Sequence, residues 1–129
     1  MNKNILEREV KVNFRFLQDK YSFSEPVAND YGREIFINYD RANQTVSISY
    51  EFGGSPRIEI LYPSAETGDR LVPWATKDGV QRSRRFPKIR LVSRFSDDEN
   101  SIAVYVKEMA VEFEKIESNW LKQNASLDL

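Results

Sequence analysis

A cluster of basic residues in the second half of the sequence is the feature best suited to binding chemistry. Residues 77–94 contain seven Lys and Arg side chains and one acid, a net charge of +6, so the rest of the chain carries −7 to give the total of −1. The most closely spaced of these cations are Arg82, Arg84, Arg85, Lys88, Arg90 and Arg94. A cluster of this kind can bind phosphate groups or an acidic protein surface.

The neighbours of this cluster allow two interpretations. Trp74, Phe86 and Phe95 flank it, as aromatic residues do on surfaces that bind single-stranded nucleic acid. Alternatively, the cations pair with acids of the same chain or contact a protein partner. A sequence pI of about 5.6 is far below the range of nucleic-acid binders, which favours the second interpretation. The acids expected within reach are Glu108, Glu112, Glu114 and Glu117.

Three glutamates, Glu34, Glu51 and Glu59, fall on three separate predicted strands. They could converge on a cation or a basic partner, because a hard metal ion needs several carboxylate oxygens together. We favour solvent-exposed sheet positions, and therefore predict no metal site. The predicted partner-binding surface consists of Trp74, Arg82, Arg84, Arg85, Lys88, Arg90, Glu51 and Glu59.

The composition argues against catalysis. Histidine is absent, which removes the usual general base near neutral pH and the commonest metal ligand. Cysteine is absent too, which excludes disulfides and thiolate metal sites. Carboxylates, lysines, tyrosines and serines remain, but none lies in a recognisable catalytic motif. We predict a non-enzymatic protein without catalytic residues or cofactors.

The sequence shows neither an N-terminal apolar h-region nor an 18-residue apolar run. This predicts a cytoplasmic protein that does not interact with membranes. Its 129 residues suffice for one domain, 1–129. The oligomeric state is left open.

The elements that must position these residues begin with a long amphipathic helix at Ser96–Gln123. Ser96 and Glu99 have the spacing of a capping box, and Asp97 and Asp98 place negative charge at the helix start. Apolar residues at steps of three and four predict one buried stripe. Its members are Ile102, Val106, Met109, Phe113, Ile116 and Trp120.

A similar spacing predicts a first helix over Asn4–Lys20, with Leu6, Val10, Phe14, Leu17 and Tyr21 on its buried side. A strand is the alternative, because Val10, Val12 and Phe14 alternate with polar residues. The helix is favoured because alternation fails after Phe16. Residues 22–33, with Pro26 and a turn-forming cluster, predict an extended arm followed by a turn.

Three runs predict an antiparallel meander: Glu34–Tyr39, Thr45–Phe52 and Arg57–Tyr62. In the second run Val46, Ile48 and Tyr50 should be buried, whereas Ser47, Ser49 and Glu51 should be exposed or at an interface. The fold class predicted is α+β, a two-layer meander of three to four strands packed against N-terminal and C-terminal helices.

The remaining segments are less regular. Residues 63–85 predict a long irregular loop anchored by Trp74. In residues 86–95, Ile89, Leu91, Ser93 and Phe95 alternate with Arg90, Val92 and Arg94, which permits a fourth strand. A short helix that uses Phe86, Ile89 and Val92 fits almost as well. Residues 124–129 are predicted to be a frayed tail.

Four motifs carry a resemblance to a known group of proteins. They are Phe16-Leu17-x-x-x-Tyr21-x-Phe23, Tyr31-Gly32-x-Glu34-Ile35, Val46-Ser47-Ile48-Ser49-Tyr50-Glu51 and Arg57-Ile58-Glu59-Ile60. Over about residues 14–62 the chain resembles small uncharacterised bacterial α+β proteins, some of which are immunity proteins of toxin systems. The basic segment 77–94 departs from the more acidic members.

We therefore expect a non-enzymatic protein-binding module, of the immunity or inhibitor type and of bacterial origin. The polar sheet face and the 63–85 loop would meet another protein, such as a toxin. The alternative is a nucleic-acid-associated accessory protein that uses the basic 77–94 segment.

Overall fold

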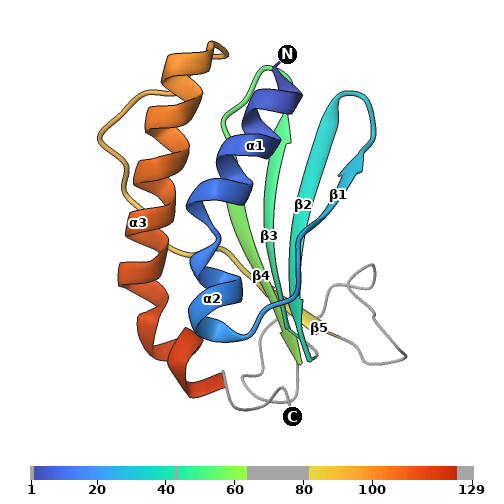
Figure 1. Cartoon of the computed structure of the whole chain (residues 1–129), viewed down its shortest axis with the longest axis vertical. Coiled ribbons are helices and arrows are strands. Elements are labelled where there is room, and N and C mark those ends of the chain that lie inside the picture. Colours follow the sequence, from blue (N-terminus) through green and yellow to red (C-terminus); the bar gives the residue numbers. More distant parts are fainter. Residues whose placement is uncertain (1, 43, 64–81, 125–129) are drawn as a thin grey trace.

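The computed structural model describes residues 2–42, 44–63 and 82–124 and shows an α+β arrangement (Figure 1). Five antiparallel strands form one sheet in the order β1-β2-β3-β4-β5. The elements are α1 (Lys3–Asn13), α2 (Phe16–Tyr21), β1 (Val27–Asp30), β2 (Glu34–Arg41), β3 (Gln44–Glu51), β4 (Arg57–Pro63), β5 (Arg82–Arg85) and α3 (Glu99–Asn124). The predicted fold class is confirmed, with more strands than expected.

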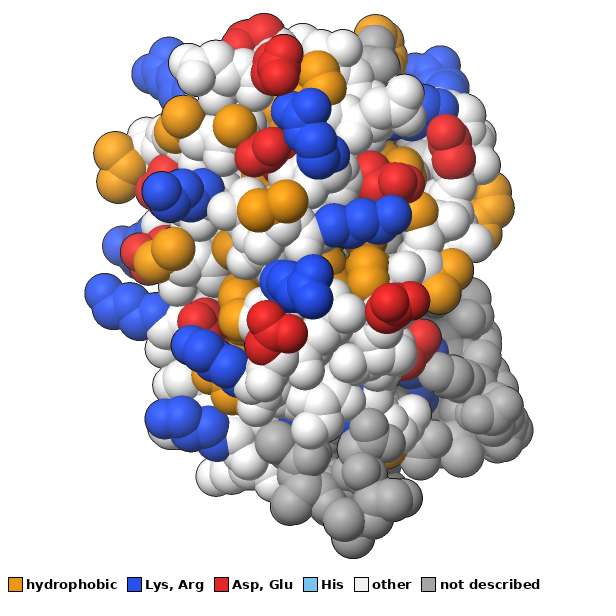
Figure 2. Space-filling model, in the orientation of Figure 1, with side chains coloured by type: hydrophobic (Ala, Val, Ile, Leu, Met, Phe, Trp, Pro, Cys, Tyr) orange, Lys and Arg blue, Asp and Glu red, His pale blue; other side chains and the backbone are white. Residues whose placement is uncertain are grey.

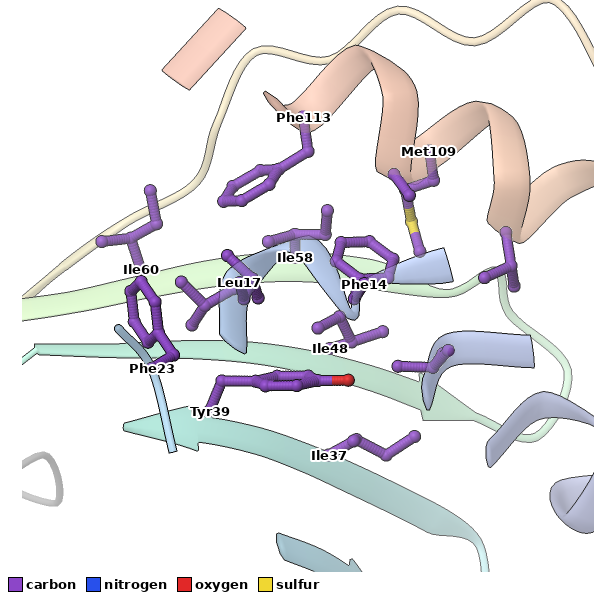
Figure 3. Close-up of a cluster of buried hydrophobic side chains, with 14 of the residues drawn as sticks. Phe14, Leu17, Phe23, Ile37, Tyr39, Ile48, Ile58, Ile60, Met109 and Phe113 are labelled. Atoms are coloured by element: carbon purple, nitrogen blue, oxygen red, sulfur yellow. The ribbon is translucent and has the colours of Figure 1, made fainter. Parts of the chain in front are cut away.

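The core lies between the helices and one face of the sheet (Figure 3). Strand alternation predicted this face correctly, because every second residue of a strand points to the same side. The sheet contributes Ile35, Ile37, Tyr39, Val46, Ile48, Tyr50, Ile58, Ile60 and Tyr62. In Figure 3, Phe113 and Met109 point from α3 toward Ile48 and Ile58 of the sheet.

The opposite face of the sheet differs from the prediction. Glu51 is exposed as expected, but Ser47 and Ser49 retain only 7% and 4% of their accessible surface. Both lie in the central strand, where Ser47 pairs with Asn38 and Glu59, and Ser49 pairs with Phe36 and Arg57. A serine between longer side chains is shielded from water even on a sheet face that faces away from the helices. The centre of this face is therefore not an open polar surface.

The N-terminal region forms two helices instead of the single helix predicted. The chain turns at Phe14 and Arg15, where the N–H groups of Leu17 and Gln18 bond to carbonyls three residues earlier. This tighter turn reorients α2, so that Phe14, Leu17 and Tyr21 are all buried. The strand alternative is wrong, since Val12 lies on a helix and is 65% exposed.

The predicted arm at residues 22–33 contains a short strand. β1 pairs with β2 over its four residues, from Val27 with Asn38 to Asp30 with Ile35. The predicted turn follows, with Gly32 at a φ of 88°, a conformation that L-amino acids adopt rarely. The Asp30 carboxylate fixes this turn by accepting hydrogen bonds from the Gly32 N–H and the Lys3 ammonium, each 2.8 Å long.

The final helix begins at Glu99, and its cap is not the one predicted. Asp98 accepts a hydrogen bond from the Ser101 N–H at 2.9 Å and another from the Ser96 hydroxyl. Asp98 is therefore the N-cap, and Ser96 supports it. These hydrogen bonds hold the pKa of Asp98 below its usual range.

The buried side of α3 matches the prediction over its first half only. Ile102, Val106, Met109 and Phe113 are buried, but Ile116 is 44% exposed and Trp120 is half-buried. Glu117 and Leu121 are buried instead.

The segment between β4 and α3 also departs from expectation. β5 occupies residues 82–85, the end of the predicted loop, while residues 86–95 form neither a strand nor a helix. Pro87 cannot donate a backbone hydrogen bond to a sheet, which limits β5 on its C-terminal side. Of the predicted frayed tail at residues 124–129, Asn124 is instead the last residue of α3. Residues 64–81, with Trp74, and residues 125–129 lie outside the described residues.

Candidate functional site

The basic residues of β5 are held by the protein itself. Alternation places Arg82 and Arg84 on the sheet face away from the helices and Arg85 on the face toward α3. Arg82 is 6% exposed, and its Nη1 donates a 2.6 Å hydrogen bond to the Thr45 hydroxyl. These contacts make Arg82 a structural residue of the sheet.

Arg85 forms the best-defined ion pair in the described part of the chain. Its Nη1 and Nη2 donate to the two carboxylate oxygens of Glu117 on α3, at 2.6 and 2.8 Å. The Glu117 side chain is only 7% exposed, and the guanidinium lies 6.0 Å from the centre of the Trp120 ring. This two-pronged pair ties the edge strand β5 to the last turns of α3.

Arg84 is attached to its surroundings more loosely. Its guanidinium lies 3.9 Å from the Glu59 carboxylate and 4.8 Å from the centre of the Phe86 ring. Burial raises the pKa of Glu59, while the nearby charges of Arg84 and Arg57 act in the opposite direction. Glu59 was predicted to be solvent-exposed, but it is 7% exposed, because it lies beside Ser47 in the shielded centre of the sheet face.

Three other cations of this region are arranged differently. Lys88, Arg90 and Arg94 are exposed, and they form no ion pair within residues 2–42, 44–63 and 82–124. They lie on one side of the segment 86–95, in which exposed and partly buried residues alternate strictly. Pro87, Ile89, Leu91, Ser93 and Phe95 are the partly buried residues.

The segment 86–95 is held against α3 by side chains instead of by sheet pairing. The Phe95 ring lies 5.2 Å from Tyr50 and 5.3 Å from Tyr105, while Ile89 and Leu91 pack against the core. On α3, the Glu108 carboxylate accepts hydrogen bonds from the Val92 N–H at 2.6 Å, from the Ser93 N–H at 3.0 Å and from the Ser93 hydroxyl. This clamp fixes the outward direction of the neighbouring cations.

We expect the clamp to loosen in acid and in the variant Glu108→Gln. The hydrogen bonds from the Ser93 hydroxyl, the Val92 N–H and the Ser93 N–H lower the pKa of Glu108 below its usual 4.5. The clamp therefore contributes fully above that value and is lost as the pH falls through the lower folded-state pKa. The NMR shifts of the Val92 and Ser93 amides should titrate with that pKa.

Amide hydrogen exchange at neutral pH provides a second readout for this clamp. Glu108→Gln should reduce protection of the Val92 and Ser93 amides, because the neutral amide offers one acceptor oxygen in place of two. Glu112→Gln, one turn further along α3, is the matched control and should leave both amides protected. Equal protection in wild type and Glu108→Gln would show that Glu108 does not hold the segment.

A small pocket opens between the segment 86–95, the start of β4 and α3. It has a volume of about 190 Å³, and most of its lining residues are apolar. The lining residues are Pro56, Arg57, Ile58, Phe86, Pro87, Ile89, Leu91, Tyr105 and Met109. Burial raises the pKa of Tyr105, so this phenol is neutral at physiological pH.

The other predicted site residues are not part of this region. Glu51 pairs directly with Glu34 across β2 and β3, and Glu59 lies on a different strand pair. Among the described residues no group of three or more potential metal ligands occurs. The predicted partner-binding surface therefore combined residues from three separate places in the structure: the sheet face, the arginines of β5 and the segment 86–95.

The pocket, the Glu108 clamp and the burial of Arg41 were not predicted from the sequence. The alternating apolar residues of 86–95 were a signal for the pocket, because they had to pack against something. Arg41 had no such signal, since it lies at a hairpin end where an exposed charge is usual. It is 1% exposed.

Comparisons of the chain with known protein families, with curated proteins and with solved structures found no match. In the part of the chain that the structure describes, no helix has the length and apolar character needed to cross a membrane.

Proposed function

We propose that this protein is a non-enzymatic, cytoplasmic protein-binding module that contacts an acidic partner through residues 86–94. The observation that carries the proposal is the division of the basic cluster. Arg82, Arg84 and Arg85 interact with the protein's own groups, whereas Lys88, Arg90 and Arg94 point outward without an ion pair among the described residues. Charges left available on a fixed segment suit recognition of an oppositely charged surface.

Figure 2, which has the orientation of Figure 1, shows how the charged side chains are spread over one face of the molecule. Over most of this face, positive, negative and hydrophobic side chains are interspersed, while Lys and Arg side chains gather along the left edge, where α3 lies in Figure 1. A mixed surface offers no preferred sign of charge to a partner. The segment 86–94 adds exposed apolar side chains to its cations, since Phe86 is 45% exposed and Val92 94%.

The type of partner follows from the resemblance over residues 14–62. We propose that the protein is of the immunity or inhibitor type and of bacterial origin, and that its partner is a toxin. A binding role is also supported by the absence of histidine from the whole sequence. An inhibitor needs a rigid, complementary surface more than reactive groups, and the Glu108 clamp provides rigidity.

Nucleic acid is the second candidate, favoured by the same exposed cations. The aromatic residues argue against it. Phe95 packs against Tyr50 and Tyr105, and the Arg84 guanidinium covers one face of the Phe86 ring, although this side chain is 45% exposed. Single-strand binders instead present free aromatic faces to the bases.

The test is a comparison of three baits in a bacterial lysate from the source strain, at low and physiological salt. The first is wild type, and the second carries Lys88→Glu, Arg90→Glu and Arg94→Glu. The third is a matched control with Lys107→Glu, Lys115→Glu and Lys122→Glu, three exposed cations of α3. Each triple changes the net charge by −6, from −1 to −7.

We expect a protein that wild type and the control retain and that the segment triple loses by about tenfold or more. Loss from both triples would indicate a response to overall charge and would contradict the proposal. Capture of nucleic acid alone, weakening steeply with salt, would favour the second candidate. Absence of any partner at both salt concentrations would also count against the proposal.

A further inference from the structure

The pocket beside the segment 86–94 has dimensions suited to part of a protein partner. Its volume of about 190 Å³ is below the roughly 300–1,000 Å³ of typical small-molecule sites. The space is sufficient for one side chain. Its floor contains Ile58 and Met109, which are buried core residues, so the floor is rigid.

We infer that this pocket receives one aliphatic or aromatic side chain from an acidic segment of the partner protein. This inference rests on the proposed function and specifies the partner's chemistry. Binding of this kind combines a buried apolar anchor with a polar rim, and the anchor supplies most of the affinity.

The charge around the pocket selects the acidic character of the occupant. Pro87, Ile89 and Leu91 line the pocket, while the residues between them, Lys88 and Arg90, point outward. Arg57 is also a lining residue, but its Nε donates a 3.2 Å hydrogen bond to the Ser49 hydroxyl on the other face of the sheet, and none of the described lining residues is acidic. A single extended stretch therefore supplies both an apolar wall and a positive rim.

The pocket wall discriminates against a phosphate as the occupant. An ionised phosphate inside an apolar wall would lose its hydration without gaining enough hydrogen bonds. An apolar side chain has no such hydration to lose when it enters the pocket. Its acidic neighbours along the partner chain stay in water, where they can face Lys88 and Arg90.

Two synthetic peptides serve as probes: a short run of Glu and Asp around a single Phe, and the same peptide with Ala in place of Phe. Each is titrated into methyl-labelled protein. The Phe peptide should shift the methyl signals of Ile58, Ile89, Leu91 and Met109. It should bind roughly 10- to 100-fold more tightly than the Ala peptide, the ratio expected for burying one large apolar side chain.

Three results would overturn the inference. Equal affinity of the two peptides would show that charge alone drives binding. Shifts confined to methyl groups away from the pocket would place the contact elsewhere. Shifts of the same four residues by a single-stranded oligonucleotide, but not by the Phe peptide, would assign the pocket to nucleic acid.

A variant pair separates the pocket from the rest of the proposed function. Leu91→Gln introduces a polar group into the pocket wall, and Val104→Gln makes the same kind of change at an exposed position of α3. Leu91→Gln should weaken binding of the Phe peptide and the captured partner by tenfold or more, about the loss of one apolar anchor. Val104→Gln should weaken neither.

If Leu91→Gln keeps the partner while the Lys88, Arg90 and Arg94 triple loses it, the pocket inference fails and the proposed function stands. If wild type retains neither peptide nor partner, both fail. Should Leu91→Gln not fold, the comparison of the two peptides on the wild-type protein decides.

Discussion

Phe113→Ala is expected to lower the free energy of unfolding by about 3–5 kcal/mol, through lost transfer energy and the cavity left behind. The Phe113 side chain is fully buried, and its ring lies 6.1 Å from that of Phe14. It joins α3 to α1 and to the sheet in the centre of the core (Figure 3). Urea denaturation followed by circular dichroism measures the loss.

Ile116→Ala is the matched control, because Ile116 lies less than one turn further along the same helix. Its side chain is 44% exposed, so its removal should cost less than about 1 kcal/mol. Both substitutions introduce Ala, and Phe and Ile have similar helix propensities, so the difference between the two variants reports the loss of packing. Equal losses from Phe113→Ala and Ile116→Ala would mean that the buried side of α3 is misassigned.

The sheet was predictable because strand alternation is a strong signal. A slip of one residue would move every side chain to the other face, so three matched runs define the core face together. β5 was not predictable in this way. Its sequence, Arg-Ser-Arg-Arg, has no apolar residues and therefore no apolar alternation. Charged side chains are common on edge strands such as β5.

The second half of α3 shows what periodicity leaves undetermined. Ile116 and Glu117 are about 100° apart around the helix, and steps of three and four allow either to continue the stripe. Tertiary partners decide between them. Arg85 pairs with Glu117, and the Tyr21 hydroxyl donates a hydrogen bond to Glu114. The buried side of α3 therefore turns around the helix axis, from Ile116 toward Glu117. Neither partner can be assigned from spacing within α3.

The same limitation applies to the candidate site. Composition identified a basic segment, and the alternation within 86–95 is present in the structure even though no strand forms there. The sequence alone could not distinguish the arginines that form ion pairs from the cations that point outward, because the difference depends on which acids lie opposite each of them in the fold. Glu117 and Glu108 were both named as acids within reach, yet one binds a guanidinium and the other a backbone turn.

Arg41 connects three parts of the fold through one side chain. Its Nη1 donates to the carbonyl of Tyr21 at the end of α2 and to that of Leu121 in α3, at 2.6 and 3.1 Å. Its Nε donates to Gln44 at 3.1 Å across the hairpin. The guanidinium also lies 4.3 Å from the Phe23 ring centre. A planar group with several fixed donors can satisfy all of these acceptors together.

Arg41→Ala should therefore lower the free energy of unfolding by more than about 3 kcal/mol, since each buried acceptor left without its donor costs about 1–3 kcal/mol. Arg41→Lys should recover only part of this loss, because one ammonium cannot reach both carbonyls and the Gln44 side chain. Arg33→Ala, at an exposed arginine of the β1–β2 turn, is the control and should cost less than about 0.5 kcal/mol. Urea denaturation of the three variants gives the comparison. A loss below about 1 kcal/mol for Arg41→Ala would mean that water replaces the guanidinium, and the ends of α2 and α3 would then be held together by apolar packing alone.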